Sequence, residues 1–136
     1  MLSPPFDEKA VSSGYKKFLF LGDLADIPYV GLFTSQTEIR AHRQLIRKTI
    51  SAVMEAVTWQ RANRAETVRL IAARFKIEPS EAERSYETMI GILSPDGAMD
   101  EKKLRAYLNL LREERPLPEN LAVEKLTDFS MLPSPR

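Results

Sequence analysis

The chain has 136 residues, of which 43% are hydrophobic and 29% are charged, and 20 basic against 19 acidic side chains give a net charge of +1. This length and composition are typical of one globular domain with a single core, and they exclude a disordered chain. The near-neutral charge gives no electrostatic reason to expect a nucleic acid or an anionic membrane as a partner.

Cysteine is absent, which excludes disulfides, thiolate metal sites and thiol nucleophiles. No apolar run reaches the roughly 18 residues that a transmembrane helix needs. The first nine residues, MLSPPFDEK, have neither the basic region nor the apolar region of a signal peptide. The chain as it stands is therefore expected in the cytoplasm.

Short apolar runs separated by turn residues fill the N-terminal quarter. Residues 1–3, 17–21 (KFLFL) and 29–34 (YVGLFT) are expected as two or three short strands. Residues 7–13 (DEKAVSS) begin with two acidic side chains, which favour a helix N-terminus, and Gly14 suits the position just past the end of that helix.

Capping signals and apolar stripes predict about four helices in the rest of the chain. The stretch from Ser35 to Glu38 matches a capping box. The helix after it is expected to break near Ala41 or His42 and to restart. The apolar face of the restarted helix contains Leu45, Ile46, Ile50, Val53 and Val57.

Three further helix starts are predicted at Asn63, Ser80 and Asp100, and the last helix is expected to end near Glu114. The expected fold class is therefore α+β and helix-rich, with two or three short N-terminal strands followed by about four amphipathic helices.

No constellation of residues indicates catalysis or metal binding. His42 is the only histidine, so a catalytic triad or a multi-histidine site would need unusual partners. The segment 96–100 (DGAMD) is too short for a calcium-binding loop and is better explained as a turn followed by a helix cap. We therefore predict no enzyme activity, no metal and no cofactor.

Several motifs, in order, give the chain a resemblance to a known family. Ser3-Pro-Pro-Phe6, Gly14-Tyr-Lys-Lys-Phe18, Gly22-Asp-Leu24 and Tyr29-Val-Gly-Leu32 occur in that order. The chain resembles the C-terminal part of the periplasmic solute-binding proteins of ABC importers, of the nitrate/sulfonate/taurine and thiamine-precursor type. Later pieces continue the resemblance along almost the whole chain, among them Ile46-Arg-Lys-Thr-Ile50, Asn63-Arg-Ala-Glu66 and Ser94-Pro-Asp-Gly97.

The resemblance implies a fragment of a two-lobed α/β periplasmic-binding-protein fold of type II, which closes on its ligand by a hinge. Residues 1–26 would be a remnant of the second lobe. Residues 27–136 would be the crossover strand and the C-terminal helices of the first lobe. The N-terminal half or more of such a protein is not in this sequence, so the resemblance implies a partial substrate-binding component.

The family also implies partners and a location. The partners are a small-molecule solute, such as a sulfonate, nitrate or a thiamine precursor, and the membrane subunits of the transporter, with no nucleic acid. The location of the parent family is the periplasm or the cell envelope.

The resemblance places the candidate ligand-binding residues in one loop and beside the crossover. Oriented N–H groups in such a loop can meet an anionic headgroup. The candidates are Ser3, Pro4, Pro5, Phe6 and Tyr29. A strand-terminating turn is the simpler explanation for the first four, and a hinge or core position for Tyr29.

Two other functions are considered. One is a helical protein-interaction module that self-associates through its apolar stripes, as a homodimer, because uncovered apolar faces favour association. The other is an enzyme of thiamine-pyrimidine synthesis, a chemistry of some relatives of the fold. Those relatives use a segment bearing His and Cys, and one His with no Cys disfavours it here.

Overall fold

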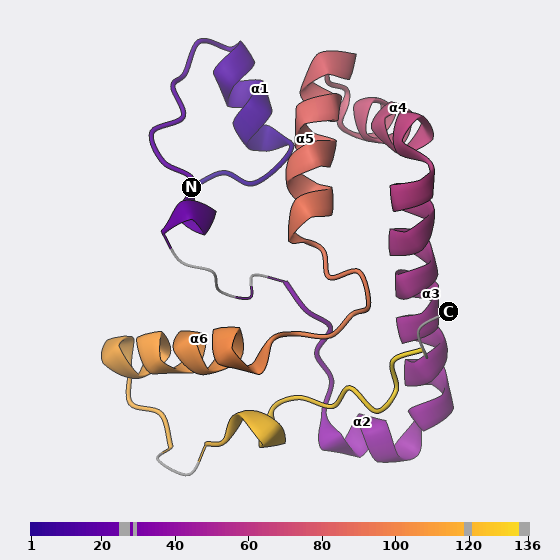
Figure 1. Ribbon diagram of the computed structural model, residues 1–136, viewed down its shortest axis with the longest axis vertical. Coiled ribbons are helices and arrows are strands. Elements are labelled where there is room, and N and C mark those ends of the chain that lie inside the picture. Colours follow the sequence, from indigo (N-terminus) through magenta and orange to yellow (C-terminus); the bar gives the residue numbers. More distant parts are fainter. Residues whose placement is uncertain (25–27, 29, 119–120, 134–136) are drawn as a thin grey trace. The chain divides into compact units, whose positions relative to one another are not determined.

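The computed structural model describes residues 1–24, 28, 30–118 and 121–133, and helices are the only regular structure in them. Figure 1 shows the six α-helices of the described chain, together with short 3-10 turns at Leu21–Asp23 and Val123–Lys125. The helices are α1 (Phe6–Ser12), α2 (Gln36–Ala41), α3 (Arg43–Ala62), α4 (Arg64–Phe75), α5 (Pro79–Ile92) and α6 (Glu101–Glu114).

The prediction of an α+β fold with N-terminal strands is wrong, because no strand occurs in the described residues. Residues 1–3, 17–20 and 30–34 are irregular, and Leu21 opens a 3-10 turn. A strand is stable only when its backbone pairs with a neighbour, so apolar composition alone does not create one. The predicted two-lobed α/β fold depends on those strands, so that prediction is wrong as well.

The predicted helices agree with the structure better than the predicted strands do. The serine half of the predicted capping box is confirmed, because the Ser35 hydroxyl accepts a hydrogen bond from the Glu38 backbone N–H at 3.1 Å. The predicted break is also confirmed, since α2 ends at Ala41 and α3 begins at Arg43. The Asp100 carboxylate caps α6 by accepting the Lys102 N–H at 2.7 Å.

The predicted start of α5 is wrong by two residues, because the helix is capped at Glu78 and not at Ser80. Pro79, not Ser80, opens the helix, because a proline lacks the N–H that a first helical residue leaves unpaired. The Glu81 carboxylate accepts the Glu78 N–H at 2.9 Å, so the glutamate three residues after Glu78 completes the cap.

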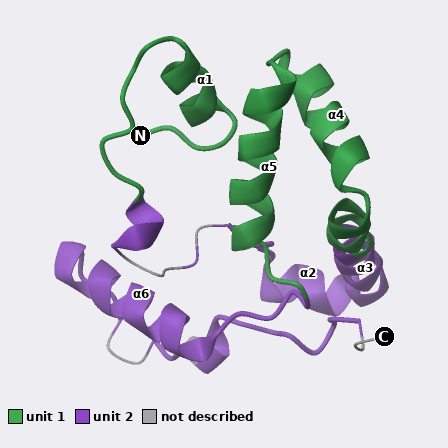
Figure 2. Ribbon diagram, turned by 45° about the horizontal axis from the view of Figure 1, so that its top comes forward, with its two compact units in different colours: residues 1–20, 55–95 green, residues 21–54, 96–136 purple. Residues whose placement is uncertain are grey.

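The chain divides into two compact units, each assembled from two stretches of sequence (Figure 2). The first unit comprises residues 1–20 and 55–95, and the second comprises residues 21–54 and 96–136. The chain passes from one unit to the other within α3.

The core of the first unit lies between α4 and α5. It is built around Ile71, Ala82 and Tyr86, each at most 8% exposed. Half-buried apolar side chains surround it: Val68, Ala72, Ile77, Met89 and Ile90. Lys76 ends α4 in the left-handed conformation, with φ 52°, which turns the chain toward α5. Helix α1 packs against α5 from the N-terminal stretch.

The second unit joins α2, the first part of α3, α6 and the C-terminal coil. Leu108 of α6 and Met131 of the coil are buried. Arg43 donates to the Ser130 hydroxyl at 3.3 Å, and Arg105 of α6 pairs with Glu124.

The apolar face of α3 is only partly covered. Val57 is buried at 8% exposure, whereas Leu45 is 64% exposed and Val53 is 40% exposed. Among the described residues, no helix is both long enough and apolar enough to cross a membrane.

Candidate functional site

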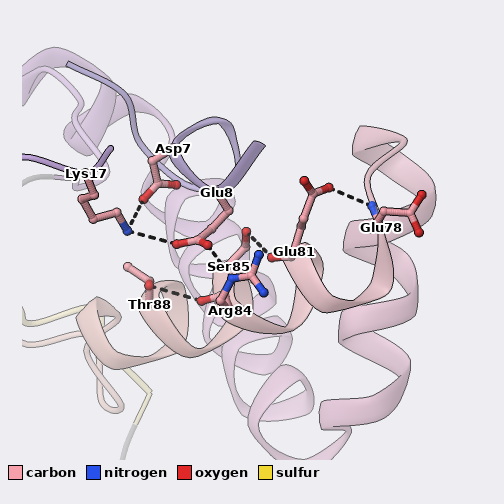
Figure 3. Close-up of polar contacts among 8 residues, drawn as sticks. All are labelled: Asp7, Glu8, Lys17, Glu78, Glu81, Arg84, Ser85 and Thr88. Atoms are coloured by element: carbon pink, nitrogen blue, oxygen red, sulfur yellow. Dashed lines mark hydrogen bonds and ion pairs between the residues drawn. The ribbon is translucent and has the colours of Figure 1, made fainter. Parts of the chain in front are cut away.

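The most densely connected polar group of the first unit lies where α1 meets α5 (Figure 3). We call it the Glu8 cluster, and it consists of Asp7, Glu8, Lys17 and Arg84. Helix α1 supplies the two carboxylates, the coil after α1 supplies Lys17, and α5 supplies Arg84. The cluster therefore links three segments, two of which are far apart in sequence.

Glu8 is the centre of the cluster. Its side chain is only 8% exposed, and each of its oxygens is bound to a different cation. Lys17 Nζ lies 3.0 Å from Oε1, and Arg84 Nε lies 2.6 Å from Oε2. A buried carboxylate is costly unless it is paired in this way, and charge-assisted hydrogen bonds are the strong ones.

The electrostatic balance fixes Glu8 as a carboxylate. Burial alone would raise its pKa, but the hydrogen bonds and positive charges of Arg84 and Lys17 outweigh that effect. The pKa of Glu8 is therefore lowered. The pKa of Lys17 is raised, first by its hydrogen bond to Glu8 and then by that to Asp7.

Asp7 completes the cluster with one oxygen. Its Oδ2 lies 3.0 Å from Lys17 Nζ, and its side chain is 14% exposed. Its Oδ1 is buried without a hydrogen-bond partner. The two carboxylates and two cations give the cluster no net charge.

A second polar link between α1 and α5 involves Glu81, which is 6% exposed. Hydrogen bonds from the Ser12 hydroxyl and then from the Glu78 N–H lower the pKa of Glu81. Beside it, the fully buried Ser85 donates its hydroxyl to the Glu81 carbonyl oxygen at 2.8 Å. Helix α1 thus contacts α5 near both of its ends. Glu8 pairs with Arg84 near its start, and Ser12 pairs with the Glu81 carboxylate of α5 at its end.

This arrangement is suited to holding two segments together. Proton transfer near neutral pH requires a carboxyl group whose pKa is raised toward that range, and the pKa of Glu8 is shifted in the opposite direction. No group of three or more potential metal ligands occurs among the described residues. We therefore interpret the Glu8 cluster as a docking contact.

The predicted ligand-binding loop forms the start of α1. The Ser3 carbonyl oxygen accepts the Phe6 N–H at 2.9 Å, and Pro5 is the buried residue at the helix cap. Ser3 is exposed and Pro4 half-buried. The Phe6 ring meets the Phe75 ring edge to face, with centroids 5.9 Å apart. The loop is a helix-initiating turn, and its contact with a ligand stays a prediction.

Other predicted positions lie apart from the cluster. Tyr29 lies outside the described residues. His42 Nε2 lies 3.7 Å from Glu38 Oε2 on the surface. In the segment 96–100, Asp96 accepts the Ala98 N–H and Asp100 caps α6, as expected for a turn and a cap.

An open cavity of about 200 Å³ lies in the second unit, between α6 and the coil after it. It is lined by Arg105, Leu108, Asn109, Arg112, Leu121 and Ala122. Arg105 is already paired with Glu101 and Glu124, and Arg112 donates to the Leu121 carbonyl oxygen at 3.2 Å. Its cations are therefore engaged within the protein.

Sequence reasoning missed the Glu8 cluster because Glu8 and Arg84 are 76 positions apart. It assigned Glu8 only to the first turn of a helix. Pro5, Glu8 and Ser12 are spaced by three and four residues, which places them on one helix face. Proline, glutamate and serine are residue types that are mostly exposed, so no local signal indicated the burial of Glu8.

No protein-family model, curated protein or solved structure matches the chain.

Proposed function

We propose that this chain is part of the substrate-binding component of an ABC-type importer for a small anionic or organic solute, such as a sulfonate, nitrate or a thiamine precursor. The ordered motifs from Ser3-Pro-Pro-Phe6 to Ser94-Pro-Asp-Gly97 support this function, because they run along almost the whole sequence. It is a binding function without catalysis.

The observation that carries the proposal is the amount of uncovered apolar surface in the motif region. Phe18 is fully exposed, Phe33 is 92% exposed and Leu32 is 63% exposed. Leu45, on the following helix, is 64% exposed. Such surface normally marks a place where further protein packs. A chain that acts as one part of a larger binding protein would leave these side chains uncovered when it is taken alone.

The loop at Ser3 is the proposed contact with the solute. Ser3 is exposed, and its hydroxyl makes no hydrogen bond within the part of the chain that the structure describes. It is therefore free to donate to an anionic group, which a small solute of this class would present.

Two experiments test the proposal. The first is sequencing of the DNA on both sides of the coding sequence, and the second is a binding measurement. We expect a continuous reading frame for further binding-protein sequence, with genes for a membrane subunit and an ATPase nearby. Isothermal titration of that longer product with taurine, nitrate and a thiamine pyrimidine should then show saturable binding, weakened by Ser3→Ala. Neighbouring genes without transporter subunits, or a longer product that binds none of these solutes, would overturn the proposal.

A second candidate is a helical module that self-associates through its apolar stripes. The partly uncovered face of α3 favours it, since Leu45 and Val53 are 64% and 40% exposed. In this case the melting temperature should rise with protein concentration, because mass action stabilises the associated state. A sharp transition at the same temperature over a hundredfold concentration range would exclude it.

A further inference from the structure

The N-terminal stretch of the first unit, residues 1–20, docks on α5 and on the end of α4 only through contacts that are distant in sequence. We call this stretch the α1 arm. Its polar links run from Glu8 to Arg84 and from Ser12 to Glu81, and its ring contact runs from Phe6 to Phe75. Nothing in these contacts depends on which copy of the chain supplies the arm.

Apart from the ion pairs of Lys17, the end of the arm does little to hold it in place, and a connector of residues 21–35 follows it. Every residue from Val11 to Leu24 is exposed. Within the described chain, the backbone groups of residues 16–20 make no hydrogen bond. The covalent path from the arm to α5 then continues through residues 21–54, which belong to the second unit. Such a connection acts as a tether, and across flexible tethers the effective concentration is on the order of 1 mM, which a second copy of the chain can match.

The end of the arm and the connector also carry apolar side chains that the single chain leaves in water. Phe18 is 100% exposed, Val30 is 75% exposed and Phe33 is 92% exposed. When two copies exchange an element, both connectors cross between the copies, and apolar side chains on them can pack in the dimer. Burial of these side chains would favour the exchanged form over two separate copies.

We propose that two copies of this chain exchange their α1 arms, so that Glu8 of each copy pairs with Arg84 of the other. The Glu8 cluster is reproduced unchanged in the dimer, because Asp7, Glu8 and Lys17 travel together on the arm. Exchange therefore keeps every polar contact of the single chain and adds the packing of the uncovered apolar side chains. This inference does not use the importer function, and it assigns the uncovered Phe18 and Phe33 to a contact between copies and not to further sequence of a larger protein.

Paramagnetic labelling tests the exchange directly, because the chain has no cysteine of its own. Chains of natural isotope abundance carry a spin label at Ser13→Cys, an exposed position next to Ser12. They are mixed with wild-type chains enriched in ¹⁵N. The protein concentration is about 1 mM, which matches the effective concentration that a flexible connection gives within one chain. At this concentration the amide signals of Ala82 and Ser85 in the ¹⁵N chains should broaden. A label at Lys102→Cys, exposed on α6, is the control for random encounters and should leave those signals sharp.

Two outcomes overturn the proposal. One is that the mixed sample shows no broadening, although the Ser13 label broadens Ala82 and Ser85 when both are in the same chain. The other is that the label fails to broaden them even in the same chain, because the arm would then not occupy α5 at all.

Charge reversal gives a second, independent test. The variants Glu8→Arg and Arg84→Glu each place like charges together when the arm docks in its own chain. In a mixture, exchange restores one native pair and one reversed pair, so a dimer of the two variants should form where neither alone dimerises. Sedimentation measures this. Each variant alone is the control, because in a sample of one variant every arm meets like charge, whether it docks in its own chain or in a second copy. A mixture that stays monomeric, like each variant alone, would contradict the exchange.

Discussion

At the scale of single residues, the docking of α1 depends chiefly on the buried carboxylate of Glu8. We predict that Glu8→Gln lowers the free energy of unfolding by about 1–2 kcal/mol, measured by urea denaturation. The amide keeps the shape of the side chain but removes the charge that faces Lys17 and Arg84. The expected loss is moderate because those cations are 41% and 50% exposed, so water screens them.

Glu83→Gln is the matched control for Glu8→Gln. Glu83 lies on the same helix as Arg84 and pairs with Arg64, but its side chain is 50% exposed. The control should change the free energy of unfolding very little, since exposed ion pairs contribute little. If both variants lower the free energy of unfolding by the same amount, the burial of Glu8 adds nothing to the strength of its ion pairs.

The pKa shifts of Glu8 and Lys17 predict how the free energy of unfolding changes with pH. The pKa of Glu8 in the folded chain lies below its ordinary value of 4.5, so its contribution is complete above pH 4.5 and is lost as the pH falls through the folded value. The pKa of Lys17 lies above its ordinary value of 10.5, so its contribution is lost only as the pH rises through that higher value.

The difference in unfolding free energy between wild type and Glu8→Gln should therefore be constant from about pH 5 to pH 9 and should shrink in acid. Urea denaturation at a series of pH values measures it. A difference that grows below pH 4.5 would show that the folded pKa of Glu8 is raised instead.

At the scale of elements, helices were predictable because their signals are local. The caps at Ser35 and Asp100 need only residues two or three positions away, and both are present in the structure. The expected strands depended on partners that periodicity does not reveal. Residues 17–21 and 30–33 have the composition of strands and no strand beside them in the described chain. The Glu8 cluster was missed for the same reason, since the segments that form it meet only in the fold.

Gly97, in the turn before α6, gives a prediction at this scale. We expect Gly97→Ala to lower the free energy of unfolding by about 1–2 kcal/mol, because φ is +79° there. A Cβ atom would also lie 2.7 Å from Leu132 Cδ2 and 2.9 Å from Met54 Sδ. These are the ends of flexible side chains, so they add less than the backbone does. Thermal or urea unfolding measures the effect.

Gly91→Ala is the control for the turn. Gly91 lies inside α5, and a Cβ atom there would meet nothing within 4 Å. Alanine should raise stability by about 0.5–1 kcal/mol, because glycine is a poor helix former. Opposite signs at the two glycines are expected, and equal signs would mean that the turn at Gly97 does not require its conformation.

At the scale of the whole molecule, the described chain buries few large side chains and exposes many. Leu108 and Met131 are the buried apolar residues of the second unit, at 6% and 3% exposure, whereas Phe18 and Phe33 are almost entirely in water. Stability and association should therefore depend on different residues. Substitutions in the small cores should change the free energy of unfolding, and substitutions of the uncovered side chains should change self-association.

We predict that Phe18→Ser combined with Phe33→Ser changes the free energy of unfolding by no more than about 0.5 kcal/mol and weakens self-association. A fully exposed side chain loses no buried contact when it is shortened, but it contributes apolar area to any contact between copies. Leu108→Ala should do the reverse. It should lower the free energy of unfolding by about 2–4 kcal/mol through the cavity left in the core, and leave association unchanged. Urea denaturation and sedimentation velocity separate the two effects. If the double serine variant is destabilised as much as Leu108→Ala, Phe18 and Phe33 pack inside the folded chain and the association surface must lie elsewhere, with the face of α3 around Leu45 as the next surface to substitute.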